Sequence, residues 1–106
     1  MAMAASIVEY TVKPEHTEEL HRRVREHLLP AAQQTKGYRG MLLLDRGDGK
    51  RLAVLLFESA KEVRAAQEAL TPIGREHAYA LMEGPALGSV GTVVIGDGVF
   101  AASAGR

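Results

Sequence analysis

The hydrophobic residues of this chain are concentrated in two short, continuous runs on either side of a turn. The runs span residues 41–44 and 52–57, and the glycine-rich residues 47–50 lie between them. An antiparallel hairpin with one face in water alternates apolar and polar residues, and neither run does so. We therefore predict that both faces of this hairpin are covered by other hydrophobic layers.

The pattern before the hairpin predicts a strand followed by a long helix. Residues 7–12 are rich in β-branched and aromatic side chains, which alternate between two faces. Pro14 suits the first turn of a helix, and Gly37 suits the left-handed residue that follows the end of one. We therefore expect a helix over residues 14–35. Its apolar stripe consists of Leu20, Val24, Leu28 and Ala31.

The pattern after the hairpin predicts two further helices and a last strand. Ser59 and Glu62 form a capping box in front of a buried stripe made of Val63, Ala66 and Leu70. We predict that this helix stops at Thr71-Pro72, where a third, short helix begins. That helix carries Ile73, His77, Ala78 and Leu81 on one face. Residues 91–95 are predicted to form the final strand, and residues 96–106 an extended or frayed tail.

This order of elements indicates an α+β, ferredoxin-like sandwich, with a four-stranded antiparallel sheet and helices on one face. No linker or internal repeat divides the 106 residues, so we predict a single domain, 1–106, whose core lies within about residues 6–95. The helices can cover only one face of the sheet. Because the hairpin is apolar on both faces, we expect a second copy of the chain to cover the other face, forming a homodimer.

Composition narrows the set of partners. The 13 basic residues balance the 13 acidic ones, so no net field attracts nucleic acid. Cysteine is absent, which excludes disulfides, thiolate metal sites and thiol nucleophiles. No apolar run is long enough to span a bilayer, and the first residues lack the pattern of a secretory signal. We expect a cytoplasmic protein with neither a nucleic-acid nor a membrane partner.

Three short motifs resemble those of a known superfamily. They are Val12-Lys13-Pro14, Lys36-Gly37-Tyr38-Arg39-Gly40 and Leu55-Leu56-Phe57-Glu58-Ser59. Together they resemble the dimeric α/β-barrel superfamily, and within it the antibiotic-biosynthesis monooxygenase-like branch. The resemblance implies that two sheets join into a barrel in a homodimer. It also implies an oxidoreductase that acts on a small aromatic or polyketide-type compound without metal or flavin.

Other members of this superfamily degrade haem. For that activity the resemblance implies an asparagine on the first strand, a tryptophan on the second helix and a histidine beyond it. The chain has no asparagine and no tryptophan, and the corresponding positions lie near Ile7 and Gln67. Only His77 matches, so haem degradation is disfavoured, and we expect no bound cofactor. No pair of histidines has the four-residue helical spacing of metal ligands, so we expect no metal site either.

His77 is the first candidate for a catalytic residue, as a general base. It shares a predicted helical face with Ile73 and Leu81, and this face should point toward the space between the helices and the sheet. A neutral imidazole there can remove an activated proton from a phenol or enol. The alternative is a half-buried histidine bonded to a backbone carbonyl. Tyr79 falls off this face and is expected at the surface or the dimer rim.

Glu9 and Tyr10 are the candidate orienting groups. Glu9 lies on a strand at the centre of the sheet, where a carboxylate needs a partner. That partner is either an arginine across the dimer, such as Arg39 or Arg51, which makes Glu9 structural, or His77 in the cavity. Tyr10 can donate a hydrogen bond to a bound carbonyl, although such tyrosines mostly serve packing.

Two functions of different classes fit these features. One is a cofactor-independent, monooxygenase-like enzyme with an apolar cavity between helices and sheet. The other is a non-catalytic homodimeric module that binds a small apolar ligand or only assembles, and the missing tryptophan and asparagine favour it. An open cavity with a polar group at its wall supports the enzyme, whereas a cavity filled by side chains supports the module.

Overall fold

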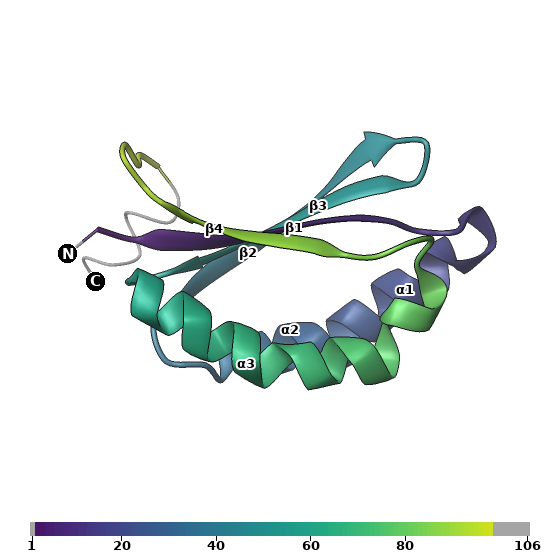
Figure 1. The fold of residues 1–106 in the computed structure, drawn as a ribbon, viewed down its shortest axis with the longest axis horizontal. Coiled ribbons are helices and arrows are strands. Elements are labelled where there is room, and N and C mark those ends of the chain that lie inside the picture. Colours follow the sequence, from purple (N-terminus) through teal and green to yellow (C-terminus); the bar gives the residue numbers. More distant parts are fainter. Residues whose placement is uncertain (1, 99–106) are drawn as a thin grey trace.

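The computed structural model describes residues 2–98, which form a four-stranded antiparallel sheet with helices on one face (Figure 1). The strand order is β2-β3-β1-β4. The strands are β1 (Ala4–Thr11), β2 (Tyr38–Gly47), β3 (Lys50–Phe57) and β4 (Leu87–Thr92). The α+β, ferredoxin-like architecture predicted from the order of elements is therefore confirmed. No helix in this part of the chain is long and apolar enough to cross a membrane.

The two faces of the sheet have different surroundings. Side chains such as Ser6, Val8 and Tyr10 of β1 point toward the helices, and their neighbours Ile7 and Glu9 point away from them. Figure 1 shows that both helical segments lie beneath the sheet, and that no helix or strand of residues 2–98 covers its other side. We call this other side the open face. Its apolar residues are Ala5, Ile7, Leu42, Leu44, Leu52, Val54, Leu56 and Leu87, and Glu9, Thr11, Lys50 and Ser89 lie on the same face.

The turn between β2 and β3 is a two-residue connection that requires left-handed backbone. Asp48 has φ of 54° and Gly49 has φ of 79°, and Gly47 pairs with Lys50 across the hairpin. Two successive positive φ angles match the twist of the flanking strands, which is why this turn type closes antiparallel hairpins. The Val12 N–H also donates to the Gly49 carbonyl at 2.8 Å, so the hairpin tip is tied to the end of β1.

The first helical segment is divided by a π-helical turn. Its parts are η1 (Pro14–His16), α1 (Thr17–Arg23), η2 (Val24–Leu28) and α2 (Leu29–Gln33). Pro30 has no N–H and its ring crowds the carbonyl four residues earlier, and a widened turn in front of it relieves this conflict. The extra residue in this turn shifts the buried face of α2 by one position. For this reason Ala32 is buried in place of Ala31, which the unbroken helical spacing had indicated.

The prediction of two helices after the hairpin is wrong, because α3 (Ala60–His77) is one helix that contains Pro72. Val63, Ala66 and Gly74 form a continuous buried stripe along it, and Pro72 lies on the exposed side. The missing backbone bond and the ring of Pro72 therefore disturb only the solvent side, while packing holds the other side. Ser59 caps the helix as predicted, since the Glu62 N–H donates to its hydroxyl oxygen at 3.4 Å, while the Glu62 carboxylate accepts from the same hydroxyl at 2.7 Å and not from the backbone N–H that a full capping box uses.

The final strand lies earlier in the chain than predicted, at β4 (Leu87–Thr92) rather than at residues 91–95. A bridge between Val12 and Met82 begins the pairing, and β4 then continues along β1 until Thr92 pairs with Ala4. The Val93 N–H still donates to the Met3 carbonyl at 2.8 Å, just before β1 begins, and Val94 and Ile95 lie beyond the sheet and are exposed. Of the predicted C-terminal tail, residues 99–106 lie outside the described residues.

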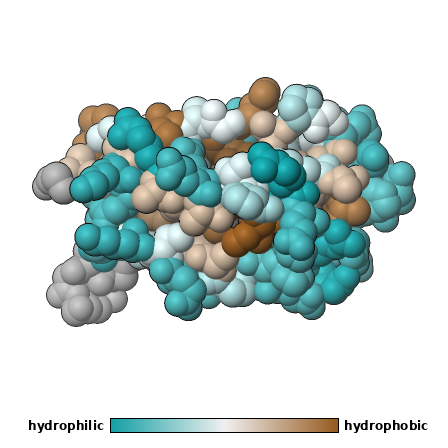
Figure 2. Space-filling model, turned by 60° about the horizontal axis from the view of Figure 1, so that its bottom comes forward, coloured by the Kyte–Doolittle hydropathy of each residue, from teal (hydrophilic) through white to brown (hydrophobic). Residues whose placement is uncertain are grey.

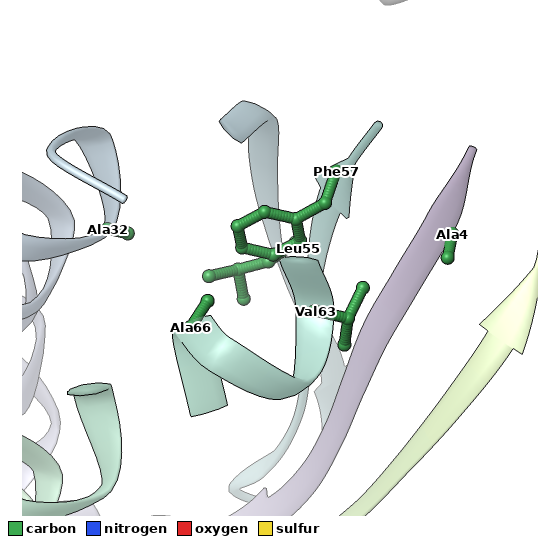
Figure 3. Close-up of a cluster of buried hydrophobic side chains, with 6 residues drawn as sticks. All are labelled: Ala4, Ala32, Leu55, Phe57, Val63 and Ala66. Atoms are coloured by element: carbon green, nitrogen blue, oxygen red, sulfur yellow. The ribbon is translucent and has the colours of Figure 1, made fainter. Parts of the chain in front are cut away.

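Two hydrophobic clusters hold the helices to the sheet at opposite ends. One contains Phe57 and Val63, which are fully buried, together with Ala4, Ala32, Leu55 and Ala66 (Figure 3). The other is centred on Val12 and Leu20 and includes Tyr10, Ala78 and Leu81. Figure 3 shows the side chains of the first cluster meeting between β3, β1 and α3. The helices are therefore anchored at both ends of the layer, and the space between the anchors is where a site can form.

Candidate functional site

A cavity of about 410 Å³ lies between the sheet and the helical layer. We call it the main cavity. Its floor comes from the sheet and its roof from η2, from α3 and from the turn that follows α3. The floor includes Ser6, Val8, Tyr10, Met41, Leu43, Ala53, Leu55 and Gly88, and the roof includes Val24, Leu28, Gln67, Leu70, Thr71, Gly74, Ala78 and Tyr79. Its volume is in the range of small-molecule sites, and its lining is predominantly apolar.

The main cavity exists because small residues face one another across the layer. Ala53 and Gly88 contribute little volume from the sheet, and Gly74 and Ala78 contribute little from the helical side. A Cβ atom on Gly88 would meet no heavy atom within 4 Å. Larger residues close the layer only at its two ends, in the hydrophobic clusters described above. The cavity is therefore open space in the fold and is not filled by side chains.

Neutral polar groups are placed on this apolar wall. Gln67 of α3 donates through Nε2 to the Ser6 hydroxyl of β1 at 3.3 Å, which bridges roof and floor. The Thr71 hydroxyl donates to the Gln67 carbonyl at 2.7 Å, so it is engaged by its own helix. Tyr79 contributes a half-exposed phenol at the rim. These groups can orient a ligand by hydrogen bonds, and none of them is charged.

Tyr10 lies in the floor of the main cavity, where a candidate orienting group can reach a ligand. Only 8% of its surface is exposed. Burial raises the pKa of the Tyr10 phenol to about 12, although the nearby positive charge of Arg51 acts in the opposite direction. At neutral pH the phenol is therefore a hydrogen-bond donor. It can donate to a bound carbonyl or to a developing oxyanion. Because it stays protonated, it cannot take up a proton as a general base.

The structure does not place His77 in the main cavity, so the predicted orientation of its side chain is wrong. Its imidazole stacks on that of His27, with ring centroids 3.8 Å apart and planes within 5°. The Arg23 guanidinium also donates through Nη1 to the His77 carbonyl at 3.0 Å. Because α3 continues through Pro72, Gly74 and Ala78 face the cavity, and His77 is turned toward the first helical segment.

Glu9 and His77 are not brought together either. Glu9 lies on the open face, on the opposite side of the sheet from the helices, where its Oε1 is 4.0 Å from Nη1 of Arg46. Arg51 cannot pair with Glu9 in the same chain, because it lies opposite Tyr10 and on the helix-facing side. Arg39 pairs instead with Glu58 at 3.2 Å. Of the three predicted site residues, only Tyr10 therefore lines the cavity, and the catalytic roles of all three stay predictions.

Sequence reasoning missed Gln67 and Tyr79 as cavity residues. Gln67, Thr71, Gly74 and Ala78 follow one another at three- and four-residue spacing, so they share one face of α3. A face that is polar or small in an otherwise amphipathic helix is a signal that could have indicated a cavity. Tyr79 was expected at the surface and is 42% exposed, yet its ring also packs over Gly74.

A smaller cavity of about 300 Å³ adjoins the main one. We call it the side cavity. Val24, Met41 and Leu43 line both. The other residues of the side cavity are His21, Arg25 and Leu29 from the helical segment and Asp45 and Arg51 from the hairpin. Figure 2 shows the helical side of the molecule, where hydrophilic side chains surround a hydrophobic patch. The side cavity differs from the main one in that charged groups line it.

The class of fold follows from the sheet order and the one-sided helical layer. It is the ferredoxin-like fold, which this chain shares with solved structures described as antibiotic biosynthesis monooxygenases. A proposed antibiotic biosynthesis monooxygenase from Nitrosomonas europaea matches with a TM-score of 0.73 and 21% identity, covering 88% of this chain and 91% of that one. Rv0793 from Mycobacterium tuberculosis matches with a TM-score of 0.70 and 15% identity, covering 92% of this chain and all of its own.

A further structural match is a variant of MhuD with two manganese protoporphyrin IX groups bound per active site. Its TM-score is 0.71 at 21% identity, and the match covers 91% of this chain and 99% of that one. No family model and no curated protein sequence matches this chain. At these identities the comparisons establish the fold, and the resemblance inferred from the three sequence motifs is confirmed at that level.

Proposed function

We propose that this protein binds a small aromatic or polyketide-type compound in the main cavity and oxygenates it without a cofactor. The observation that carries the proposal is an open, apolar cavity whose wall presents the neutral hydrogen-bond donor Tyr10. Similar folds in proposed antibiotic biosynthesis monooxygenases support this choice of reaction. Flat aromatic rings suit the space between Val8 and Leu55 of the floor and Leu28 of the roof.

Without a cofactor, the substrate itself must supply the electrons that reduce O2. An activated methylene flanked by aromatic rings loses a proton, and the resulting carbanion reduces O2 and forms a C–O bond. The hydroperoxide then loses its remaining C–H proton as the O–O bond breaks, which leaves a carbonyl and releases water. In this scheme the Tyr10 phenol donates to the substrate oxygen that carries the delocalised negative charge. Gln67 and Ser6 orient the polar edge of the substrate, and the apolar wall excludes water.

One observation favours the second candidate function, a non-catalytic ligand-binding module. Among the described residues, the wall of the main cavity contains no imidazole and no carboxylate. An enzyme built on this cavity therefore depends on a substrate acidic enough to lose its proton to water, whereas a binding protein has no such requirement. The two functions share the same cavity and ligand class and differ in whether oxygen is consumed.

We further propose that two copies of the chain associate through the open face. Leu42 and Leu44 of β2 and Leu87 of β4 are exposed there by 46%, 43% and 63%, and the half-buried Ile7 of β1 and Leu52, Val54 and Leu56 of β3 lie between them. A contiguous apolar surface of this kind on a sheet is typical of a protein interface. Association would give the hairpin the second hydrophobic layer that its unbroken apolar runs call for.

An anthrone bearing phenolic hydroxyls tests the first proposal, because it is flat, apolar and has an activated methylene. We expect binding, followed by one O2 consumed for each carbonyl formed, as measured with an oxygen electrode and by absorbance. Tyr10→Phe should reduce the rate by about 10-fold or more, because it removes one hydrogen bond to the developing charge. Tyr38→Phe is the matched control, since Tyr38 lies outside the main cavity and packs on Phe57.

Each outcome of this experiment decides between the candidates. Binding without oxygen uptake above the uncatalysed rate would leave the ligand-binding module as the function. Equal rates for the wild type and Tyr10→Phe would remove Tyr10 from the mechanism. Absence of binding to the folded protein would contradict both candidates.

A further inference from the structure

We infer that the side cavity is a carboxylate subsite, so that the ligand of this protein is an aromatic or apolar organic acid. Its ring system would lie in the main cavity and its carboxylate would bind at Arg51. This inference rests on the proposed function and adds to it the chemical class of the ligand.

Arg51 has a buried guanidinium with hydrogen-bond donors that lack an acceptor within residues 2–98. Its side chain is 92% buried, and both of its hydrogen bonds come from Nη1, to Asp45 Oδ1 at 2.9 Å and to the Lys50 carbonyl at 3.2 Å. Its Nε is buried without a hydrogen-bond partner among the described residues. A buried N–H without an acceptor is costly, and native proteins rarely leave one. The edge formed by Nε and Nη2 is therefore where an acceptor is missing.

A carboxylate is the acceptor that fits this edge. A guanidinium presents parallel N–H groups at the spacing of the two oxygens of a carboxylate, and the paired bonds fix orientation as well as adding energy. A single water can accept from both N–H groups only through bent bonds, and it brings no negative charge to the guanidinium. Because Arg51 lines the side cavity, a ligand in that space can approach Nη2, and Nε, which neighbouring atoms cover, joins the contact after a small movement of the guanidinium.

The charges around the side cavity favour an anion. Asp45 already neutralises much of the Arg51 charge through their ion pair. Arg25, on the helical side of the same cavity, forms no ion pair among the described residues and so adds a positive charge. His21 adds a further ring nitrogen that can donate. The only carboxylate in the lining is Asp45, and it is 70% exposed at its side chain, so the local balance remains positive.

One ligand can reach both cavities. The two share Val24, Met41 and Leu43, and Tyr10 of the main cavity is the cross-strand neighbour of Arg51 in the side cavity. Directly paired residues on adjacent strands have Cβ atoms about 4.5–5.5 Å apart. The phenol of Tyr10 and the guanidinium of Arg51 therefore meet the ligand as neighbours, with the phenol near the ring system and the guanidinium near the acid.

A pair of nearly isosteric probes tests the inference. Anthracene-2-carboxylate carries the charge, and anthracene-2-carboxamide has the same rings and shape without it. We expect the wild type to bind the carboxylate at least about 10-fold more tightly than the amide, by fluorescence titration. This preference should shrink as salt is added, since part of it arises from the exposed Arg25.

Substitutions test whether the preference for the carboxylate over the amide comes from the side cavity. Arg51→Gln should weaken carboxylate binding by about 10-fold or more and change amide binding by less than about 2-fold. Arg25→Gln should weaken the carboxylate by a smaller factor, and it is the second test if Arg51→Gln fails to fold. Arg64→Gln is the control for the same loss of charge, because Arg64 lies on the exposed side of α3. Gly88→Phe should block both probes, since its ring would fill the main cavity.

The outcomes separate this inference from the proposed function. If both probes bind equally, and Arg51→Gln and Arg25→Gln affect neither, the carboxylate subsite is wrong while the cavity stands. If neither probe binds the wild type, or Gly88→Phe leaves binding unchanged, the proposed ligand cavity itself is wrong. Preference for the carboxylate that persists in both arginine variants would place the anion elsewhere and would also overturn the inference.

Discussion

At the scale of single residues, Tyr10 illustrates how burial sets chemistry. Its phenol is enclosed by residues from other elements, so ionisation is disfavoured and its pKa rises to about 12. The neutral phenol is thus favoured in the folded state relative to the unfolded chain. The stabilisation is complete below the ordinary pKa of 10.0 and is lost as the pH rises toward about 12, because the unfolded chain releases this proton first.

The corresponding prediction concerns stability at alkaline pH. Wild-type unfolding free energy should decline between about pH 10 and pH 12, and Tyr10→Phe should lose part of this decline because it lacks the phenol. Urea denaturation at several pH values measures this slope. Tyr79→Phe is the control, since Tyr79 is 42% exposed, and it should follow the wild type. A slope in Tyr10→Phe identical to that of the wild type would contradict the burial of an un-ionised phenol.

His77 leads to a prediction about activity. Its ring stacks on that of His27 outside the main cavity, so His77→Ala should leave ligand affinity and any oxygen uptake within about 3-fold of the wild type. Loss of the stacked contact should instead lower the stability by about 0.5–1.5 kcal/mol. Parallel activity assays and urea denaturation check both parts. A loss of turnover with unchanged affinity would restore the catalytic role that the sequence suggested.

At the scale of elements, the β2–β3 turn shows two separate requirements for glycine. Gly47 has φ of 90°, and a Cβ added to it would meet nothing within 4 Å, whereas a Cβ on Gly49 would lie 2.7 Å from the Val12 carbonyl oxygen. The first glycine is needed for its backbone angle alone. The second is needed for its angle and for the close approach of the hairpin to the end of β1.

These two glycines form a matched pair for mutation. Gly47→Ala should destabilise the fold by about 1–2 kcal/mol, the usual cost of a left-handed residue with a Cβ. Gly49→Ala should cost more, about 2–4 kcal/mol, because the added atom also displaces the Val12 backbone. The midpoints of urea unfolding measure the difference. Equal losses would show that the contact with Val12 relaxes without cost.

At the scale of the whole molecule, the open face of the sheet has no second layer from residues 2–98 packed against it. Exposed leucines lie on both edge strands, β2 and β4, on a side that none of the described helices covers. Glu9 lies between Leu52 and Leu87 on this face and pairs with Arg46, and both side chains are more than half exposed. An apolar sheet with few charges is prone to associate, and association with a second copy would bury it.

The prediction for assembly follows from the proposed homodimer. Sedimentation velocity should show a dimer for the wild type at micromolar concentration and a monomer for Leu44→Glu, because the interface would have to bury an unpaired carboxylate. Ala69→Glu introduces the same charge on the exposed side of α3 and should stay dimeric. A monomeric wild type, or a dimeric Leu44→Glu, would contradict association through this face.

The features that the sequence determined by itself depend on neighbours within a few residues. The apolar runs predicted β2 and β3, Ser59 and Glu62 predicted the start of α3, and alternation along β1 placed Tyr10 and Glu9 on opposite faces of the sheet. Turn chemistry, capping and side-chain alternation act over one to four positions, so they can be predicted from the sequence alone. The same local signals, through the three motifs, were enough to predict the fold.

The features that only the tertiary structure decided depend on residues far apart in the chain. Packing along its buried stripe carries α3 through Pro72, and this continuity turns His77 away from the cavity. The length of β1 places β4 at residues 87–92, ahead of the more apolar run at 93–95. The main cavity itself is volume left between Ala53, Gly88 and Gly74, and a missing volume has no local signature. Sequence therefore specified which elements form, and packing between them specified where a ligand can bind.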